Sequence, residues 1–426
     1  MTRSHQFSSF ATVACLTTLA LIAIFMMSTF AANTAQAQTF TVLHEFTGGL
    51  DGANPSAGLT LAPTGRLFGT SSGSTPDTSG AAFTVTDSQS NWLLNPLYRF
   101  VQFGHGLYPN TRLIFGPDGS IYGTTWKGGA GACAGQGCGV VFKLQPPATL
   151  ACRLAFCPWT ETVLYTFAGG ADGSLPGPLT FDAAGNIYGN TYYGGTADCQ
   201  CGTVYELKFS GGHWSKTILH SFSVSDGADP DGPVVLDRAG NLYGTAITGG
   251  SSNTGVVYEL SPSGESWTET ILHNFQGSEG YYPNGGLIAD SSGNLYGVAS
   301  EGGSIGLGTV FRLTQPGTWT LETLYSFTSY ASGGSPHGPL AFDGGGNLYG
   351  VADFGLFSRG TIFGLTLANK TWIPFDLHDF NGSDGIYVNP GLVVDNAGNI
   401  YGTSFGDTKI DACYPTGCGN IWQITP

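Results

Sequence analysis

A chain of 426 residues with a net charge of −15, only 10% charged residues and many aromatic ones is a poor candidate for a nucleic-acid-binding protein or a disordered protein. The negative charge repels phosphate backbones, so nucleic acid is not an expected partner. The 13% of aromatic residues argues against disorder, and 67 glycines beside so many aromatic side chains are typical of short strands joined by tight turns.

The first 37 residues have the pattern of a signal peptide. Arg3 supplies a positive charge, an apolar run follows from Phe10 to Phe30, and Ala35-Gln36-Ala37 fits a small-x-small cleavage site. We therefore expect residues 1–37 to be removed and the protein to be exported, to the periplasm or beyond the cell, with an uncleaved anchor as the alternative. No later stretch is long and apolar enough to span a bilayer.

An aromatic residue followed by glycine recurs through the rest of the chain and defines a repeat of roughly 50 residues. In six repeats a tryptophan also precedes a phenylalanine by eight residues, as Trp267 precedes Phe275. This constant spacing predicts one strand of fixed length in each repeat. The aromatic–glycine pairs are Phe68-Gly69, Tyr122-Gly123, Tyr188-Gly189, Tyr243-Gly244, Tyr296-Gly297, Tyr349-Gly350 and Tyr401-Gly402.

Each repeat contains four strand-like runs, named A to D in chain order. In the fifth repeat they are residues 286–290, 294–298, 308–313 and 319–327. Seven such units predict an all-β fold, a seven-bladed β-propeller of four-stranded antiparallel blades formed by residues 38–426 as a single domain. A β-solenoid is the alternative, although its repeats are usually shorter. The aromatic–glycine pair is expected to let a ring of an adjacent blade pack closely on bare backbone.

The two ends of the repeat region each lack part of a repeat. Residues 39–46 have the pattern of a strand D without strands A, B and C, whereas the last repeat has runs at 391–395, 399–403 and 419–424 but no strand D. We therefore expect the N-terminal strand to join the last blade and close the ring, which leaves no unpaired edge.

Units such as Gly240–Leu260 (GNLYGTAITGGSSNTGVVYEL), followed by Ser266–Phe275 (SWTETILHNF), resemble the GloVer tandem repeats. That family comprises exported bacterial repeat proteins with varied surface anchors, and the resemblance covers essentially all of the chain after residue 37. It implies a propeller-like protein outside the cytoplasm and adds neither catalytic residues nor a cofactor. The chain stops at Pro426, directly after its last strand, so no C-terminal anchor is expected.

Eight cysteines follow the signal segment, and an even number in an exported chain is typical of disulfides. The C-x4-C spacing favours the local bridges Cys133–Cys138, Cys152–Cys157 and Cys413–Cys418. The pairing of Cys199 with Cys201 stays open, because a C-x-C ring is strained. Zinc is the alternative, but its sites favour C-x-x-C pairs or nearby histidines, so no metal is expected.

Several recurring polar residues are interpreted as scaffold. One position of strand D holds His44, His220, His273 or His378 in some repeats and Tyr98, Tyr165 or Tyr325 in others, which indicates a half-buried structural role. Asp182, Asp237, Asp290, Asp343 and Asp395 end strand A, where Asp usually caps backbone N–H groups. The A runs that should line the central channel are apolar, which argues against a metal-dependent hydrolase or lyase.

A binding site is expected where the repeats differ, on the face that carries the B–C loops and the D–A connections. Trp126 ends a strand B, and aromatic residues at the ends of other B strands could complete a half-ring that stacks on sugars. Lys127, Glu301 and Asp407 nearby could bind hydroxyl groups. The aromatic counterparts of Trp126 are Tyr192, Tyr193, Phe354 and Phe405.

These residues favour a non-catalytic, monomeric binding module for a neutral glycan such as a polysaccharide, or for a cell-surface protein. Three alternatives stay open. The aromatic rings could merely plug the mouth of the propeller, since buried aromatics are commoner than ligand platforms. The chain could also be a metal-dependent hydrolase or lyase, or a structural protein of the cell envelope.

Overall fold

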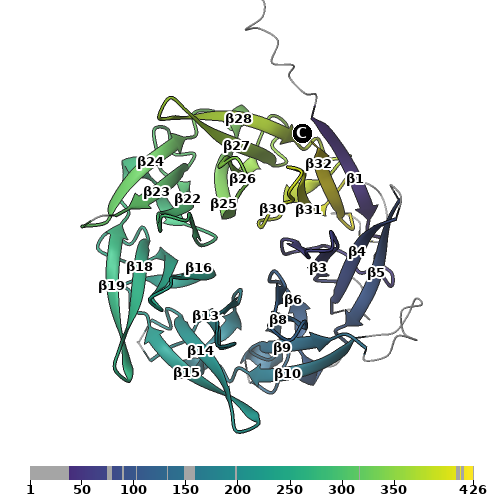
Figure 1. The fold of residues 1–426 in the computed structure, drawn as a ribbon, viewed down its shortest axis with the longest axis vertical. Helices are drawn as coiled ribbons and strands as arrows, with labels where there is room; N and C mark the ends of the chain where they lie inside the picture. Colours follow the sequence, from purple (N-terminus) through teal and green to yellow (C-terminus); the bar gives the residue numbers. More distant parts are fainter. Residues whose placement is uncertain are drawn as a thin grey trace, which may run out of the picture. The chain divides into compact units, whose positions relative to one another are not determined.

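Short runs of β-branched and aromatic residues, separated by glycine-rich turns, fold each repeat into a small antiparallel sheet. In the computed structural model seven such sheets surround a central axis, with their strands stacked from the axis to the rim (Figure 1). This arrangement confirms the predicted seven-bladed β-propeller. The structure describes residues 38–73, 79–88, 91–101, 103–131, 133–147, 159–196, 199–315, 317–408, 413 and 417–425. The predicted signal peptide, residues 1–37, lies outside the described residues.

In the first four blades the strands follow one another from the axis outward. They are β2 (Thr60–Leu61), β3 (Leu67–Ser71), β4 (Ala81–Ser88) and β5 (Asn91–Arg99) in blade 1; β6 (Leu107–Pro109) with β7 (Ile114–Phe115), β8 (Ile121–Lys127), β9 (Val140–Gln145) and β10 (Thr160–Thr166) in blade 2; β11 (Ser174–Pro176) with β12 (Thr180–Phe181), β13 (Ile187–Tyr193), β14 (Thr203–Ser210) and β15 (His213–Ser221) in blade 3; and β16 (Ala228–Leu236), β17 (Leu242–Thr248), β18 (Val256–Ser263) and β19 (Ser266–Asn274) in blade 4.

The last three blades repeat this order. Their strands are β20 (Tyr281–Pro283) with β21 (Ile288–Ala289), β22 (Leu295–Glu301), β23 (Thr309–Thr314) and β24 (Thr320–Ser326) in blade 5; β25 (Gly334–Phe342), β26 (Leu348–Phe354), β27 (Thr361–Ala368) and β28 (Thr371–Asp379) in blade 6; and β29 (Ile386–Val388) with β30 (Val393–Val394), β31 (Ile400–Gly406), β32 (Asn420–Thr425) and the N-terminal β1 (Thr39–Glu45) in blade 7.

The N-terminal strand closes the ring, as the sequence predicted. β1 pairs with β32, and the backbone N–H of Phe46 donates to the carbonyl of Gly419 at 3.0 Å. Phe46 then contacts Phe83 of blade 1, with ring centroids 5.3 Å apart. Figure 1 shows β1 beside β32 at the rim, where the two ends of the propeller meet.

Helical structure in the described residues is confined to short 3-10 turns. These turns lie in connections between strands, and none of the helices in this part of the chain is long and apolar enough to cross a membrane. The turns are η1 (Phe103–His105), η2 (Cys133–Gly135), η4 (Gly170–Asp172), η5 (Gly277–Glu279) and η6 (Tyr330–Ser332).

Strand D joins each blade to both of its neighbours, which explains the constant Trp-to-Phe spacing. In blade 4, Trp267 contacts Tyr188 of blade 3, and Phe275 contacts Phe311 of blade 5. A β-bulge between these two ends, where Val257 pairs with His273 but Tyr258 pairs with Ile271, shifts the alternation of the strand by one residue. The two rings therefore face opposite neighbours.

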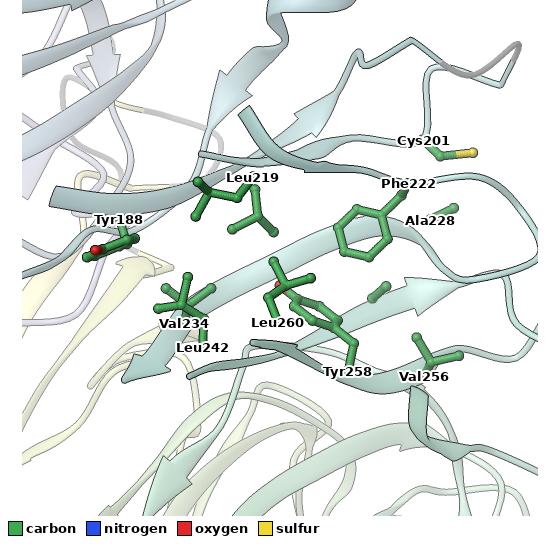
Figure 2. Packing of buried hydrophobic residues seen from close by; sticks show 12 residues of the cluster. Tyr188, Cys201, Leu219, Phe222, Ala228, Val234, Leu242, Val256, Tyr258 and Leu260 are labelled. Carbon is green, nitrogen blue, oxygen red and sulfur yellow. The ribbon is translucent and has the colours of Figure 1, made fainter. Parts of the chain in front are cut away.

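The glycine of each aromatic–glycine pair is covered by a ring of its own blade, which corrects the expectation of a ring from an adjacent blade. Gly244 pairs with Tyr258 across strands B and C, and a Cβ at Gly244 would overlap the Tyr258 ring. The register between B and C sets this contact. Figure 2 shows Tyr258 packed beside Phe222 and Leu260 in the buried layer between blades 3 and 4.

Each blade is also fixed to the preceding one through its backbone. A non-glycine residue with φ between 52° and 60° begins the inner segment of every blade, and its N–H donates to a carbonyl of the preceding blade at 2.7–3.2 Å. In blade 5 this residue is Tyr282, which bonds Thr254, and the next residue, Pro283, packs on Gly255. The seven residues with this conformation are Asn54, Tyr108, Leu175, Asp229, Tyr282, Ser335 and Tyr387.

Candidate functional site

The B–C loops and the D–A connections lie on the same face of the propeller, because they are hydrogen-bonded to each other. Gly250 N–H donates to the carbonyl of Val224 at 2.8 Å, and Gly303 N–H donates to that of Gly277 at 3.0 Å. This face carries the predicted site residues at the last two positions of their B strands. Trp126 and Lys127 end β8, Tyr192 and Tyr193 end β13, Glu301 ends β22, Phe354 ends β26, and Phe405 precedes the last residue of β31.

The predicted half-ring divides into two sets, because successive residues of a strand point to opposite sides of the sheet. Trp126, Tyr192 and Phe405 occupy the sixth position of strand B, whereas Lys127, Tyr193, Glu301 and Phe354 occupy the seventh. Trp126 and Tyr193 are exposed, with 43% and 47% of their surface accessible. Asp407 is only 2% exposed, so the structure places it beneath the surface instead of on it.

Most of these side chains contact neighbours on the same face. The rings of Tyr192 and Tyr193 meet edge to face at 4.8 Å, and Phe354 meets Tyr330 in the same way at 5.1 Å. The ammonium group of Lys127 lies 5.0 Å from the centre of the Tyr108 ring. Glu301 is directly opposite Tyr281 in the strand pairing. Trp126 differs from the other aromatic residues because it lines a cavity.

This cavity of about 440 Å³ lies in the central channel and is lined by the inner segments of all seven blades. Its wall carries a ring of half-buried polar residues that directly follow the inner proline of their blades. This ring was not predicted, because the apolar A runs begin after it. A polar residue that recurs after proline is the sequence signal that marks it. The ring residues that line the cavity are Ser56, Asn110, Asp231, Asn284 and His337.

Two residues of this ring also connect blades. Ser56 Oγ donates to the carbonyl of Pro109 at 3.3 Å, and His337 Nε2 is 3.1 Å from the carbonyl of Val388, where only a protonated Nε2 can donate. Asp231 has a raised pKa, mainly because burial disfavours its charged form, while the Gly232 N–H and the charge of His337 act against that increase.

The cavity wall contains one arginine. Arg112 Nε donates to Thr60 Oγ1 at 3.3 Å, and burial lowers the pKa of its guanidinium. The titratable groups among the described lining residues are therefore Arg112, Asp231 and His337. Together with Trp126 they combine an aromatic surface at the mouth with charged and hydrogen-bonding groups inside. The channel wall is therefore not formed by the apolar A runs alone, because polar residues that precede these runs also line it.

No three His, Cys, Asp or Glu side chains of the described residues gather into a group that could hold a metal ion. The strand D histidines instead pair with acids of the D–A connections, as His273 does with Glu279 at 2.7 Å and His378 with Asp384 at 3.0 Å. Tyr165 bonds Asp172 in the same manner at 2.7 Å. Both His and Tyr can donate a hydrogen bond to an acid, so either residue can occupy this position of strand D. This agrees with the predicted structural role.

The acids at the ends of strand A cap the turns that follow them. Asp290 Oδ1 accepts from the N–H groups of Ser292 and Asn294 at 2.8 and 3.0 Å, and its Oδ2 accepts from Asn294 Nδ2 and the Tyr296 hydroxyl. Asp182, Asp237, Asp343 and Asp395 make the corresponding bonds. These bonds agree with the predicted capping role, because both carboxylate oxygens accept hydrogen bonds from the turn and the strand that follows it.

The cysteines on this face form local disulfides. Cys133 is bonded to Cys138, Cys199 to Cys201, and Cys413 to Cys418. Cys152 and Cys157 lie outside the described residues, so their bridge stays a prediction. The three bonded pairs all hold B–C loops, the segments that border the mouth of the channel.

Known structures share this fold at low sequence identity. A polysaccharide lyase described as an ulvan lyase is 11% identical with a TM-score of 0.54, over 90% of this chain and 95% of that one. The extracellular domain of a protein assigned as a one-component system of B. thetaiotaomicron is also 11% identical, with a TM-score of 0.51, over 91% of this chain and 42% of that one. No curated protein sequence matches the chain.

The sequence profile of a bacterial repeat family matches the chain twice, over residues 28–200 and 182–412. These two segments include the repeated aromatic–glycine pairs and the strand D spacing on which the fold depends. The protein therefore belongs to the Gloeobacter/Verrucomicrobia repeat family.

Proposed function

We propose that this protein is an exported, non-catalytic binding protein that holds a saccharide at the mouth of its central channel. The observation that carries the proposal is the position of Trp126. This side chain is 43% exposed and lines the same cavity as the polar ring. A plug would be buried by its neighbours, whereas Trp126 presents a free aromatic surface to the channel.

The chemistry of this site suits a sugar. The face of an indole ring packs well on the apolar C–H face of a pyranose, and the side chains of Ser56, Asn110 and Asn284 can exchange hydrogen bonds with hydroxyl groups. The volume of about 440 Å³ falls within the roughly 300–1,000 Å³ of small-molecule sites. Family membership and the disulfides support a periplasmic or extracellular location, where polysaccharides are available as ligands.

The test compares Trp126→Ala with Tyr193→Ala in binding to a glycan array, followed by calorimetry on the best oligosaccharide. Tyr193 is a matched control, because it is exposed and aromatic but does not line the cavity. Trp126→Ala should weaken binding about tenfold, since loss of one stacking contact is worth roughly 1.4 kcal/mol. Tyr193→Ala should bind like the wild type.

Thermal unfolding of both variants controls for damage to the fold. Equal binding by Trp126→Ala and the wild type would contradict the proposal, and so would a wild-type protein that binds no glycan on the array. A loss with Tyr193→Ala alone would move the site away from the channel to the wider face.

A further inference from the structure

Arg112 differs from the residues at the same position in the other six blades, which are all glycine or proline. It directly precedes the first buried Leu or Val of strand A, a position that holds only glycine or proline elsewhere, and it replaces a small residue by the longest cation available. The repeats therefore differ in the channel wall itself, and within the same blade that supplies Trp126. The residues at this position in the other blades are Gly58, Pro178, Pro233, Gly286, Pro339 and Gly391.

The guanidinium of Arg112 has an incomplete set of partners. A guanidinium carries five N–H donors, and the one hydrogen bond found among the described residues is that from Nε to Thr60 Oγ1 at 3.3 Å. The Lys and Arg ion pairs in this part of the chain do not include Arg112. Arg112 is half-buried in the channel wall, and a cation that loses part of its hydration in this way is normally paired with an acid.

The acid in the same cavity does not supply this compensation. No hydrogen bond or ion pair among the described residues joins Asp231 to Arg112. Burial also favours the neutral form of Asp231, which reduces the repulsion that an anionic ligand would meet.

We propose that the saccharide held in the channel carries a carboxylate, as uronic acids do, in place of the neutral glycan expected from the sequence, and that Arg112 binds this carboxylate. This inference rests on the proposed function and names its ligand class. The planar guanidinium fork matches a carboxylate with two parallel hydrogen bonds, which a lysine cannot provide. Trp126 and Arg112 come from the same blade and line one cavity, so both border the space that a bound saccharide would occupy.

The experiment uses an array of uronate oligosaccharides, each beside the same oligosaccharide with its carboxylates reduced to hydroxymethyl groups. Sulfated neutral oligosaccharides form a third set. The proteins are the wild type, Arg112→Gln, Arg112→Lys and Arg66→Gln, whose arginine is exposed in the turn between the first two strands of blade 1. Thermal unfolding of each variant controls for folding, and Arg112→Lys keeps the charge if Arg112→Gln does not fold.

The wild type and Arg66→Gln should bind a uronate oligosaccharide at least tenfold more tightly than its reduced form. Arg112→Gln should bind both forms equally, and Arg112→Lys should keep only part of the difference. A uronate preference that survives Arg112→Gln would overturn this inference while leaving saccharide binding through Trp126 intact. Preference for the reduced or sulfated forms would also overturn it, and binding to no saccharide would remove both proposals.

Discussion

Replacing Glu269 with glutamine should stabilise the folded protein above pH 7 and leave it unchanged below pH 5. Glu269 lies on β19 and faces blade 3, where its Oε1 atom is buried without a hydrogen-bond partner among the described residues. Burial, followed by the nearby charge of Asp226, raises its pKa to about 7. The corresponding residue one blade earlier is Lys216, which pairs with Asp172 at 2.9 Å. The interface between blades 3 and 4 therefore has two acids, Asp226 and Glu269, at the place where the interface between blades 2 and 3 has an ion pair.

The size of the effect follows from this pKa. A change from 4.5 to about 7 corresponds to about 3 kcal/mol for a fully buried group, and solvent screening of this half-buried side chain reduces it to about 1–2 kcal/mol. The folded state binds the proton more tightly than the unfolded state. The resulting contribution to stability is therefore fully present below pH 4.5 and is lost as the pH rises through about 7. Glutamine cannot ionise and avoids this loss.

The assay is urea unfolding of the wild type, Glu269→Gln and Glu265→Gln between pH 5 and pH 8. Glu265 is an exposed control just before β19. Asp226 and Tyr258 lie near Glu269, and His220 pairs with Asp226 at 3.5 Å. Burial lowers the pKa of His220, which acts in the opposite direction at low pH. Comparing variants at each pH cancels that contribution. A stability difference between Glu269→Gln and the wild type that does not change with pH would refute this reasoning.

Three further predictions concern the scaffold. Deleting residues 39–46 removes β1 and leaves β32 as an unpaired edge, so light scattering should detect aggregation and the melting temperature should fall; a truncated protein that melts like the full chain would show that closure lies elsewhere. Gly255→Ala places a Cβ against Pro283 at a φ of +95° and should cost about 1–3 kcal/mol in urea unfolding, whereas Gly344→Ala, in open space, should cost little. Mass spectrometry of the non-reduced protein should find Cys133 linked to Cys138 and Cys152 linked to Cys157, and free thiols at Cys133 and Cys138 would contradict the first pairing.

The blades were predictable because their signals are local and repeated. The spacing from Trp267 to Phe275 identified strand D in six repeats, and the structure adds the reason, which is that the two rings contact opposite neighbours. The partner of Gly244 was assigned to the wrong blade, because a period of two along a strand does not reveal which residue of strand C lies opposite. That register depends on the whole sheet.

Only part of the candidate site could be predicted from the sequence. Trp126 was found because it is an aromatic residue out of register with the other tryptophans, and the structure brings it to the cavity. Arg112, Asp231 and His337 were missed. In each of their blades the inner segment begins with a left-handed residue before the inner proline, and the sequence did not reveal this conformation. A Tyr, Asp or Ser with positive φ leaves no periodic pattern in the sequence.

The bonds that begin each inner segment have a consequence for how such proteins diverge. They are formed by backbone N–H and carbonyl groups and by a proline ring in six of the seven blades, so they do not depend on which side chain comes next. Replacing the residue after the proline alters the lining of the channel while the contact between blades persists. Duplicated blades can therefore drift apart in ligand preference through single substitutions, and close relatives can share one frame while recognising unlike molecules.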